Sequence, residues 1–282
     1  MYKYWIAVYS DVFFSSFFFS MMTSIGIMSE ILSPYFAASD AEGSQKEDKE
    51  NPPSCSRLVG DFYNQDASRL ARALLGKILV RRLNKDELIC GRIVETEAYL
   101  GVEDKACHSF GHRRTARTKP MFMKPGTIYV YSIYGMYHCM NVSSFGDGAA
   151  VLLRAIEPLL GLDQMRDLRH RNQRTQRPFH PHQLCNGPSK ICLSYSIGKE
   201  LNEIDLSSSS SPIWIEDWNS QAEFQIVTSS RIGLGKKAEE WASAPLRFYV
   251  LGSTSVSVTD LSAKKRMSSK HVNHPRSAKR EC

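Results

Sequence analysis

Two stretches decide how this chain folds: RIVETEAYLG at Arg92–Gly101 and TIYVYSIYGMYHCMNVSS at Thr127–Ser144. In the first stretch Ile93, Glu95, Glu97 and Tyr99 occupy every second position, which is the period of a β-strand. We expect these four side chains to lie on one face of that strand. In the second stretch, alternating aromatic residues flank Tyr134–Gly135, a pair of residues typical of a hairpin tip.

An aromatic ring at a hairpin tip is exposed unless another element covers it. Between the two stretches lies a run of basic side chains: His112, Arg113, Arg114, Arg117, Lys119 and Lys124. Flat rings offer a stacking surface for a nucleobase, and Lys and Arg attract its phosphates. Together these features indicate a nucleic-acid partner.

The composition permits one substantial domain with tails. Of 282 residues, 42% are hydrophobic, which is enough for one core. Residues 1–56 hold three Lys/Arg against seven Asp/Glu, a net charge of about −4. Because the whole chain has a net charge of +7, the remaining residues carry about +11. A basic surface favours phosphate-rich partners, although this count alone is also typical of ordinary solvated surfaces. We expect the domain to span residues 57–260.

The two ends have different compositions. Val12–Ser29 is uncharged and rich in Phe, close to the ~18 apolar residues of a membrane span, but Ser and Thr interrupt it. A cleaved or anchoring segment, a mitochondrial or other targeting extension, and a start codon placed too early all stay open, so membrane association is unresolved. Residues 39–56 indicate a disordered linker. Residues 261–282 indicate a basic disordered tail, in which Lys264–Arg266 is a candidate nuclear signal.

Seven scattered cysteines, with no C-x-x-C pair, predict reduced thiols in a cytosolic or nuclear protein. Cys107, His108 and His112 are close in sequence and are candidate metal ligands. Gly111 separates the two histidines and no further Cys/His cluster lies nearby, so we expect no metal.

Periodicity and turn residues predict the other elements. Helices are expected over 64–76, 161–171 and 236–244, and one begins near Asn186–Lys190 with Pro188 in its first turn. Strands are expected over 77–83 and 87–100, joined as a hairpin at Asn84–Asp86, and over 213–218, 224–235 and 246–252. Five serines, Ser207–Ser211, predict a flexible insertion. The basic stretch 171–183 is either a mobile loop near DNA or a solvated surface.

Three strings resemble one known family: GRIVETEAYLG (91–101), MFMKPGTIYVYSIYGMYHCMN (121–141) and VLLRAIEP (151–158). They closely resemble the alkyladenine (3-methyladenine) DNA glycosylases, which are monofunctional base-excision enzymes, and the similarity is continuous from about Leu70 to Val258. The resemblance implies an α+β single domain, in which helices surround a curved antiparallel sheet and a hairpin protrudes. It also implies hydrolysis of the N-glycosidic bond of damaged purines, flipped out of duplex DNA, to leave an abasic site. The purines concerned are 3-methyladenine, 7-methylguanine, hypoxanthine and ethenoadenine.

The resemblance implies roles for two charged residues. Glu97 matches the residue that activates the water attacking C1′, and an ordinary ionised Glu is already a base at neutral pH. Arg154, which follows an apolar run, is expected to pair with Glu97 because an isolated buried Arg is unfavourable. Glu95 is expected to be a solvated surface group or an ion-pair partner. A second carboxylate is not required, because an alkylated purine is a good leaving group.

Further positions match the family's base pocket and DNA contacts. Tyr99, His108 and Tyr131 match the residues that sandwich the flipped base, and an electron-rich ring favours a cationic base. Asn141 matches the residue that excludes guanine by opposing its 2-amino group. Tyr134 is expected to enter the minor groove and fill the gap left by the flipped base. Met136 and Tyr137 would support it, and Arg113, Arg117 and Lys190 are candidates for contacts with the DNA backbone.

The expected partners are damaged double-stranded DNA and downstream base-excision-repair proteins, with the protein monomeric, nuclear and free of cofactors. No Lys stands in the three strings as an amine nucleophile, so we expect no strand-cleaving lyase step. Two alternatives stay open. One is a lesion- or RNA-binding protein without turnover, and the other is a hydrolase of free nucleosides, which would need neither Tyr134 nor the basic residues.

Overall fold

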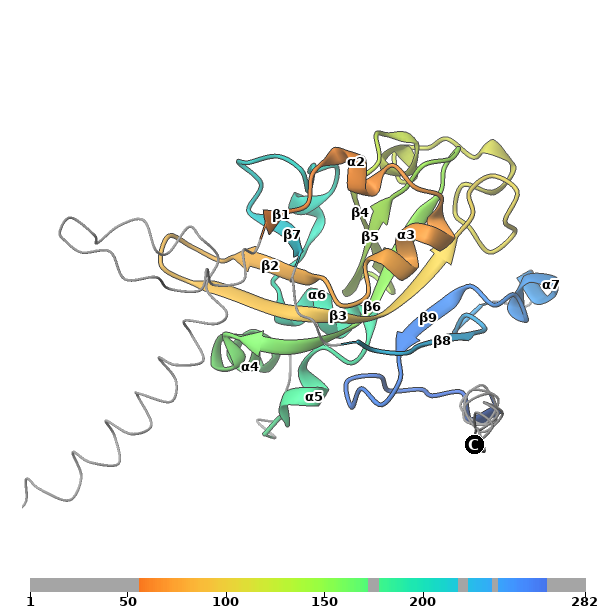
Figure 1. Ribbon diagram of the computed structural model, residues 1–282. Helices are drawn as coiled ribbons and strands as arrows, with labels where there is room; N and C mark the ends of the chain where they lie inside the picture. Colours follow the sequence, from red (N-terminus) through yellow and green to blue (C-terminus); the bar gives the residue numbers. More distant parts are fainter. Residues whose placement is uncertain (1–55, 172–177, 218–222, 235–237, 263–282) are drawn as a thin grey trace, which may run out of the picture. The chain divides into compact units, whose positions relative to one another are not determined.

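The computed structural model describes residues 56–171, 178–217, 223–234 and 238–262 (Figure 1). The chain divides into Met1–Ser56 with Trp218–Ser220, and a second unit of Arg57–Asp217 with Gln221–Cys282. Apart from Ser56, every element below belongs to the second unit. The apolar N-terminal segment, the linker as far as residue 55, Lys264–Arg266 and residues 172–177 of the basic stretch lie outside the described residues, so their predictions stay predictions.

In the part of the chain that the structure describes, nine strands form one open sheet, in the order β1-β7-β2-β3-β6-β5-β4, with β9 joined to β3 and β8 to β9. The strands are β1 (Ser56–Arg57), β2 (Ile78–Arg82), β3 (Leu88–Tyr99), β4 (Ile128–Ile133), β5 (Tyr137–Ser143), β6 (Ala150–Leu160), β7 (Ile213–Asp217), β8 (Ile226–Ser229) and β9 (Arg247–Val250). The helices, described below, are few and short. The predicted α+β class with an antiparallel sheet is confirmed.

The long strand β3 is the centre of the sheet and curves through the molecule (Figure 1). Its first half pairs with β2, from Arg82 opposite Leu88 to Ile78 opposite Arg92, which confirms the predicted hairpin. Its second half pairs on the same side with β9 instead. Along its other edge β3 pairs with β6 over most of its length. The residues of the candidate site therefore lie on a strand with neighbours on both edges.

One detail of β3 differs from the prediction. The pairing of β3 with β6 is irregular on both sides of Glu95, so the alternation of side chains is interrupted there. Ile93 packs into the main hydrophobic core and does not share a face with Glu97. The irregularity also separates the segment paired with β2 from the segment paired with β9.

Helices pack against the sheet to form the core. Helix α3 (Ala67–Ala73) lies within the predicted range 64–76 and is capped by Asp66, whose side chain accepts a hydrogen bond from the Arg69 N–H. Its buried Leu70 belongs to the main core, as does Ile191 of α6 (Pro188–Ser194). The other helical segments are α2 (Gly60–Tyr63), α4 (Leu162–His170), α5 (Pro181–Leu184), α7 (Glu239–Ala242) and the 3₁₀ turns η1 (Phe110–His112), η2 (Lys119–Phe122) and η3 (Lys199–Leu201).

Strands β4 and β5 form the predicted hairpin, with Ile133 opposite Tyr137. At its tip Tyr134 has φ 52° and Gly135 has φ 71°, so both residues adopt the left-handed backbone conformation. Gly adopts this conformation readily, whereas Tyr does so at a cost of about 1–2 kcal/mol. The turn thus directs the Tyr134 ring away from the sheet.

The serine run is ordered, and the predicted flexible insertion is wrong. The Ser207 N–H donates to the Asp205 carboxylate at 2.9 Å, and the Ser208 carbonyl accepts from the Arg57 guanidinium. Ser211 is buried, and its hydroxyl bonds the Ile213 carbonyl. Serine hydroxyls form such local turns readily, and composition alone does not separate these turns from a flexible linker.

Candidate active site

Cross-strand register brings the candidate residues onto one face of the sheet. Glu97 of β3 lies opposite Leu152 of β6, which lies opposite Asn141 of β5, which lies opposite Tyr129 of β4. Directly paired residues in antiparallel strands point to the same side, as do residues two apart. Along their strands, Tyr99 is two residues after Glu97, Tyr131 is two after Tyr129, and Arg154 is two after Leu152, so these side chains lie on the same face. Thr96 points the other way, and its hydroxyl donates to the Ala71 carbonyl in α3.

Glu97 is fully buried at the centre of this face. Its Oε1 accepts from the Ile232 N–H at 2.8 Å and lies 3.2 Å from Arg154 Nη1, and its Oε2 accepts from the Tyr99 hydroxyl at 2.9 Å. Burial raises the pKa of the Glu97 carboxyl, while Arg154, the Ile232 N–H and the Tyr99 hydroxyl act in the opposite direction. Burial is the largest effect, because removing a carboxylate from water disfavours its charged form.

Arg154 joins the two carboxylates of β3. Its Nη1 pairs with Glu97, and its Nε donates to Glu95 Oε1 at 3.3 Å. The same Glu95 oxygen accepts from Arg247 Nη1 at 2.8 Å. Glu95 is therefore buried between two guanidinium groups: the expectation of an ion-pair partner is met, and that of a solvated group is wrong. The predicted pairing of Arg154 with Glu97 is present.

A pocket of about 290 Å³ is lined in part by Tyr99, whose hydroxyl donates to Glu97. It is lined by Tyr99, Lys105, Ala106, Cys107, His108, Met121, Tyr129, Tyr131, Asn141, Ala150, Gly233, Leu234 and Ala238. The four expected pocket residues are thus brought together, and Tyr129 joins them. The rings of Tyr129 and Tyr131 have centroids 5.5 Å apart, and His108 meets Tyr131 edge-on at 4.7 Å. Such a pocket suits a flat aromatic ligand.

His108 is held neutral in this pocket. Its Nδ1 is 2.9 Å from the Tyr129 hydroxyl, and its Nε2 is 3.2 Å from Arg117 Nη2. Burial, and then the charge of Arg117, lower the pKa of His108 to about 4. Because a guanidinium only donates, Nε2 accepts, and the proton of the neutral ring is on Nδ1.

Asn141 lines the same pocket and is almost fully buried. Its Nδ2 donates to the Tyr129 carbonyl at 3.1 Å, which fixes the side-chain amide against β4. A fixed amide can discriminate between ligand edges, because a buried polar group without a partner is unfavourable.

The hairpin tip is exposed. Tyr134 is 88% exposed and Met136 is 71% exposed, and Tyr137 beside them is 40% exposed. Large apolar side chains gathered at a protruding turn are typical of a surface that contacts another molecule. Since Tyr134 is not in the core, its placement meets the first requirement of a side chain that enters DNA.

The model of the methylpurine-DNA glycosylase family matches residues 61–254. The chain belongs to this family. It is 53% identical over 208 residues to the DNA-3-methyladenine glycosylase of Homo sapiens, and this match covers 73% of the chain and 69% of that protein. It is 52% identical to the mouse (Mus musculus) DNA-3-methyladenine glycosylase over 208 residues, 72% of the chain but 62% of that protein. The putative 3-methyladenine DNA glycosylase of Clostridium perfringens (strain SM101 / Type A) is 46% identical over 198 residues, 69% of the chain and 95% of that protein.

The family expected from the three strings is confirmed. The enzyme class is confirmed with it: this member of the methylpurine-DNA glycosylase family is a DNA glycosylase, which hydrolyses N-glycosyl bonds. The individual roles of its residues stay predictions.

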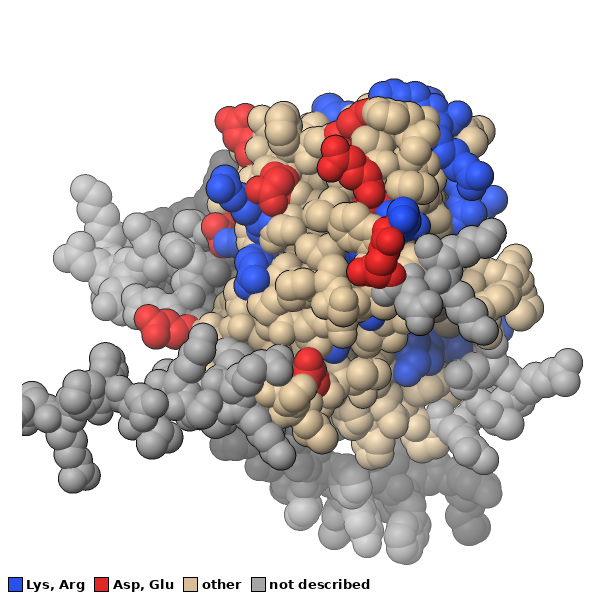
Figure 2. Space-filling model, turned by 90° about the vertical axis from the view of Figure 1, so that its right-hand side faces the viewer, with Lys and Arg blue, Asp and Glu red and all other residues tan. Residues whose placement is uncertain are grey.

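The expected contacts with the DNA backbone have different surroundings in this family member. Arg113 is exposed, and Lys190 is half-buried with its Nζ donating to Asn186 Oδ1 at 2.6 Å. Arg117 is exposed, but its guanidinium is directed at His108 and Tyr131. Figure 2 shows the side of the molecule on which the loop of residues 100–126 lies. Lys and Arg side chains gather at the upper right of this view.

Sequence reasoning missed a buried ion pair behind the site of this family member. Arg231 donates to Asp104 through Nη1 at 2.6 Å and Nη2 at 3.1 Å, and both side chains are fully buried. Nη1 also donates to the Ala98 carbonyl, and the guanidinium lies 4.7 Å from the Tyr99 ring centre. The next residue is Ile232, which donates to Glu97. No local motif signals this contact, because its partners are 127 residues apart.

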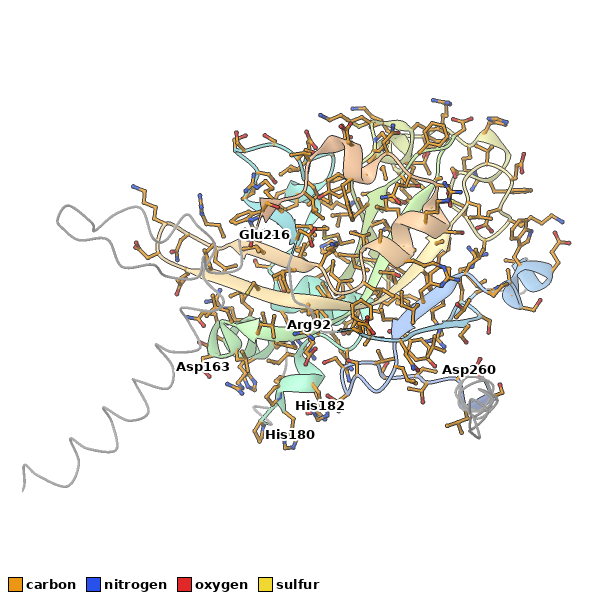
Figure 3. The ribbon with its side chains drawn as sticks, in the orientation of Figure 1. Arg92, Asp163, His180, His182, Glu216 and Asp260 are labelled. Carbon is orange, nitrogen blue, oxygen red and sulfur yellow. The ribbon has the colours of Figure 1, made fainter. Side chains whose placement is uncertain are left out.

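Groups of His, Cys, Asp and Glu that could hold a metal were not found among the described residues. Cys107, Cys139, Cys185 and Cys192 are buried free thiols. His180 and His182 lie at the beginning of α5, at the lower side of Figure 3. In the described ranges, no helix has the length and apolar character needed to cross a membrane.

Proposed function

We propose that this protein is a DNA-3-methyladenine glycosylase that flips alkylated or deaminated purines out of duplex DNA, hydrolyses their N-glycosidic bond and leaves an abasic site. The observation that carries the proposal is the buried Glu97 carboxylate, which accepts a hydrogen bond from the Tyr99 hydroxyl, while the Tyr99 ring lines a pocket of aromatic side chains. The relatives named as DNA-3-methyladenine glycosylases support the same function. Alkylated purines, hypoxanthine and ethenoadenine are the proposed substrates.

Glu97 is suited to activate a water molecule. Each carboxylate oxygen can accept two hydrogen bonds, and Oε2 accepts only one from the described protein groups, from the Tyr99 hydroxyl. A water on the free lone pair would transfer a proton to Glu97 while its oxygen bonds to C1′. The bond from C1′ to the purine nitrogen breaks, and its electron pair stays on the purine. A positively charged methylpurine leaves as a neutral molecule, so no second carboxylate is needed as an acid.

The pocket supplies stacking for the flipped base. Tyr99, His108 and Tyr131 offer the ring surfaces, and a cationic methylpurine gains attraction from their electron-rich faces. A neutral lesion depends more on shape and on hydrogen bonds to His108 and Asn141. Exposed Tyr134 would fill the space that the base leaves, and so offset part of the unstacking energy of a few kcal/mol.

A single-turnover assay tests this function. The full chain is incubated with duplexes that contain hypoxanthine, 7-methylguanine or ethenoadenine, and the released base is measured. Glu97→Gln should bind the lesion duplex but lose excision by about 10²-fold or more, because it removes the general base. The matched control is Glu103→Gln, which changes an exposed carboxylate in the neighbouring loop and should excise normally.

The same assay separates the two rivals. A binding protein without turnover would release no base from any duplex, and that result would contradict the proposal. A nucleoside hydrolase would cleave free inosine at least as well as the hypoxanthine duplex. Normal excision by Glu97→Gln would remove the mechanism while leaving the family unchanged.

A further inference from the structure

Arg117 contacts two of the rings that the proposed function assigns to the flipped base. Its Nη2 lies 3.2 Å from His108 Nε2, and its guanidinium carbon lies 5.2 Å from the centre of the Tyr131 ring. His108 and Tyr131 both line the 290 Å³ pocket. A side chain expected to contact the DNA backbone is therefore directed at the pocket.

A guanidinium is a chemical analogue of the expected ligand at this position. It is flat, positively charged and able to donate hydrogen bonds in its plane, like a protonated or alkylated purine. It uses the electron-rich Tyr131 ring for a cation–π contact and the lone pair on His108 Nε2 for a hydrogen bond. A purine stacked on Tyr131 and bonded to His108 would need these same groups.

The contacts of neighbouring cations differ from those of Arg117. Arg114 pairs with Asp147 at 2.8 Å, Lys119 with Glu203 at 2.6 Å and Lys124 with Asp205 at 2.6 Å. Among the described residues, Arg117 has no carboxylate within ion-pair distance. It is exposed and bound to the pocket by weak contacts, so it can leave without breaking an ion pair with these residues.

Arg117 also determines which hydrogen bond His108 offers. While Arg117 donates to Nε2, that nitrogen is an acceptor and Nδ1–H donates to the Tyr129 hydroxyl. The Tyr129 hydroxyl can equally donate to Nδ1. Once Arg117 leaves, the proton can therefore reside on Nε2, where it could bond an acceptor on the edge of hypoxanthine or ethenoadenine.

We propose that Arg117 lies against Tyr131 and His108 of the base pocket in the DNA-free enzyme, competes with the flipped base for these two side chains, and leaves when the base enters. The proposal rests on the proposed function, since it assumes that these rings bind a purine. It makes Arg117 a specificity-determining residue, because the base must displace a cation before it can stack.

Binding of the free base to the DNA-free full chain tests this competition without any contribution from phosphate contacts. The probes are ethenoadenine, followed by its fluorescence, and hypoxanthine, followed by calorimetry. Arg117→Gln should bind both bases about fivefold or more tightly than the wild-type chain, because one cation–π contact and one hydrogen bond no longer compete. The matched control Arg114→Gln removes the same charge from the same loop, and its affinity for free base should equal that of the wild type.

A second measurement does not depend on glycosylase activity. In NMR titrations of the DNA-free protein, the pKa of His108 should rise in Arg117→Gln, since the nearby positive charge that lowers it is removed. It should stay low in Arg114→Gln. Equal or weaker free-base affinity in Arg117→Gln would overturn the proposal, as would an unchanged His108 pKa. If the wild-type chain excises hypoxanthine from duplex DNA while Arg117→Gln gives either result, this inference alone fails. If the wild type excises nothing, the proposed function fails.

Discussion

At the residue scale, the site combines a buried carboxylate with groups that keep its negative charge tolerable. Burial raises the pKa of Glu97, and a base must be ionised to accept a proton. Arg154, Ile232 and Tyr99 each favour the ionised form through one contact. The excision rate should therefore decline as the pH falls through the raised pKa of Glu97, above the range of an ordinary Glu.

Tyr99→Phe should move that decline to higher pH. The substitution keeps the ring in the pocket but removes the hydroxyl that donates to Glu97 Oε2. Losing a donor to the ionised form raises the pKa of Glu97 further, so more of the enzyme is protonated at a given pH. Single-turnover rates measured against pH would show the shift. Superimposable profiles for the wild type and Tyr99→Phe would mean that this hydroxyl does not tune Glu97.

Several of these residues could be predicted from the sequence, and others could not. Strand period placed Glu97 and Tyr99 together, since two positions along a strand keep a side chain on one face. The cost of an isolated buried Arg, together with the family resemblance, placed Arg154 beside Glu97. The same reasoning misplaced Ile93, because the irregularity beside Glu95 breaks the period. The direction of the Arg117 side chain depends on a contact made in three dimensions, which no periodicity encodes.

At the element scale, the β4–β5 hairpin separates two tasks. Its strands contribute Tyr129, Tyr131 and Asn141 to the pocket, while its tip presents Tyr134 to solvent. Tyr134–Gly135 identified this turn from sequence, because Gly after an aromatic residue between alternating strands is a strong local signal. Ser207–Ser211 gave a misleading signal, since its turns are fixed by Asp205 and Arg57.

Tyr134→Ser should weaken the binding of lesion duplex without altering the pocket. Loss of stacking by one ring corresponds to about 1–3 kcal/mol, or roughly 5- to 150-fold in affinity. Tyr134→Phe keeps the ring and should retain nearly all of the affinity. Fluorescence anisotropy with a hypoxanthine duplex would measure both. If the Ser and Phe variants bound equally, the exposed ring would not be an intercalating group.

At the scale of the whole molecule, segments far apart in sequence converge on the back of the site. The ion pair of Asp104 with Arg231 links the loop that carries His108 to the segment that carries Ile232. Asp104 also accepts from the Leu100 and Ala106 N–H groups, which fixes the turn after β3. The class of fold could be predicted from the sequence, but this long-range link could not, because neither residue lies in a repeating pattern.

Asp104→Asn should destabilise the protein more than Asp147→Asn, a substitution at an exposed ion pair between β5 and β6. Removing one partner of a fully buried ion pair leaves a charge uncompensated, which costs about 3–5 kcal/mol. Asp147→Asn breaks contacts of exposed Arg114 and His112 and should cost less than about 1 kcal/mol. Urea denaturation of both variants would give the comparison. Similar midpoints for the two would show that the buried pair adds little to stability.

The pairing of β3 on both edges affects how readily different parts of the protein open locally. Residues 95–97 have β6 on one edge and β9 on the other, so their backbone amides are covered from both directions. In deuterium oxide these amides should exchange among the slowest in the chain, through opening of the whole sheet. Glu97 would then lie on the segment that opens last, whereas Tyr134 at the hairpin tip and Arg117 beside the pocket can move without opening of the sheet.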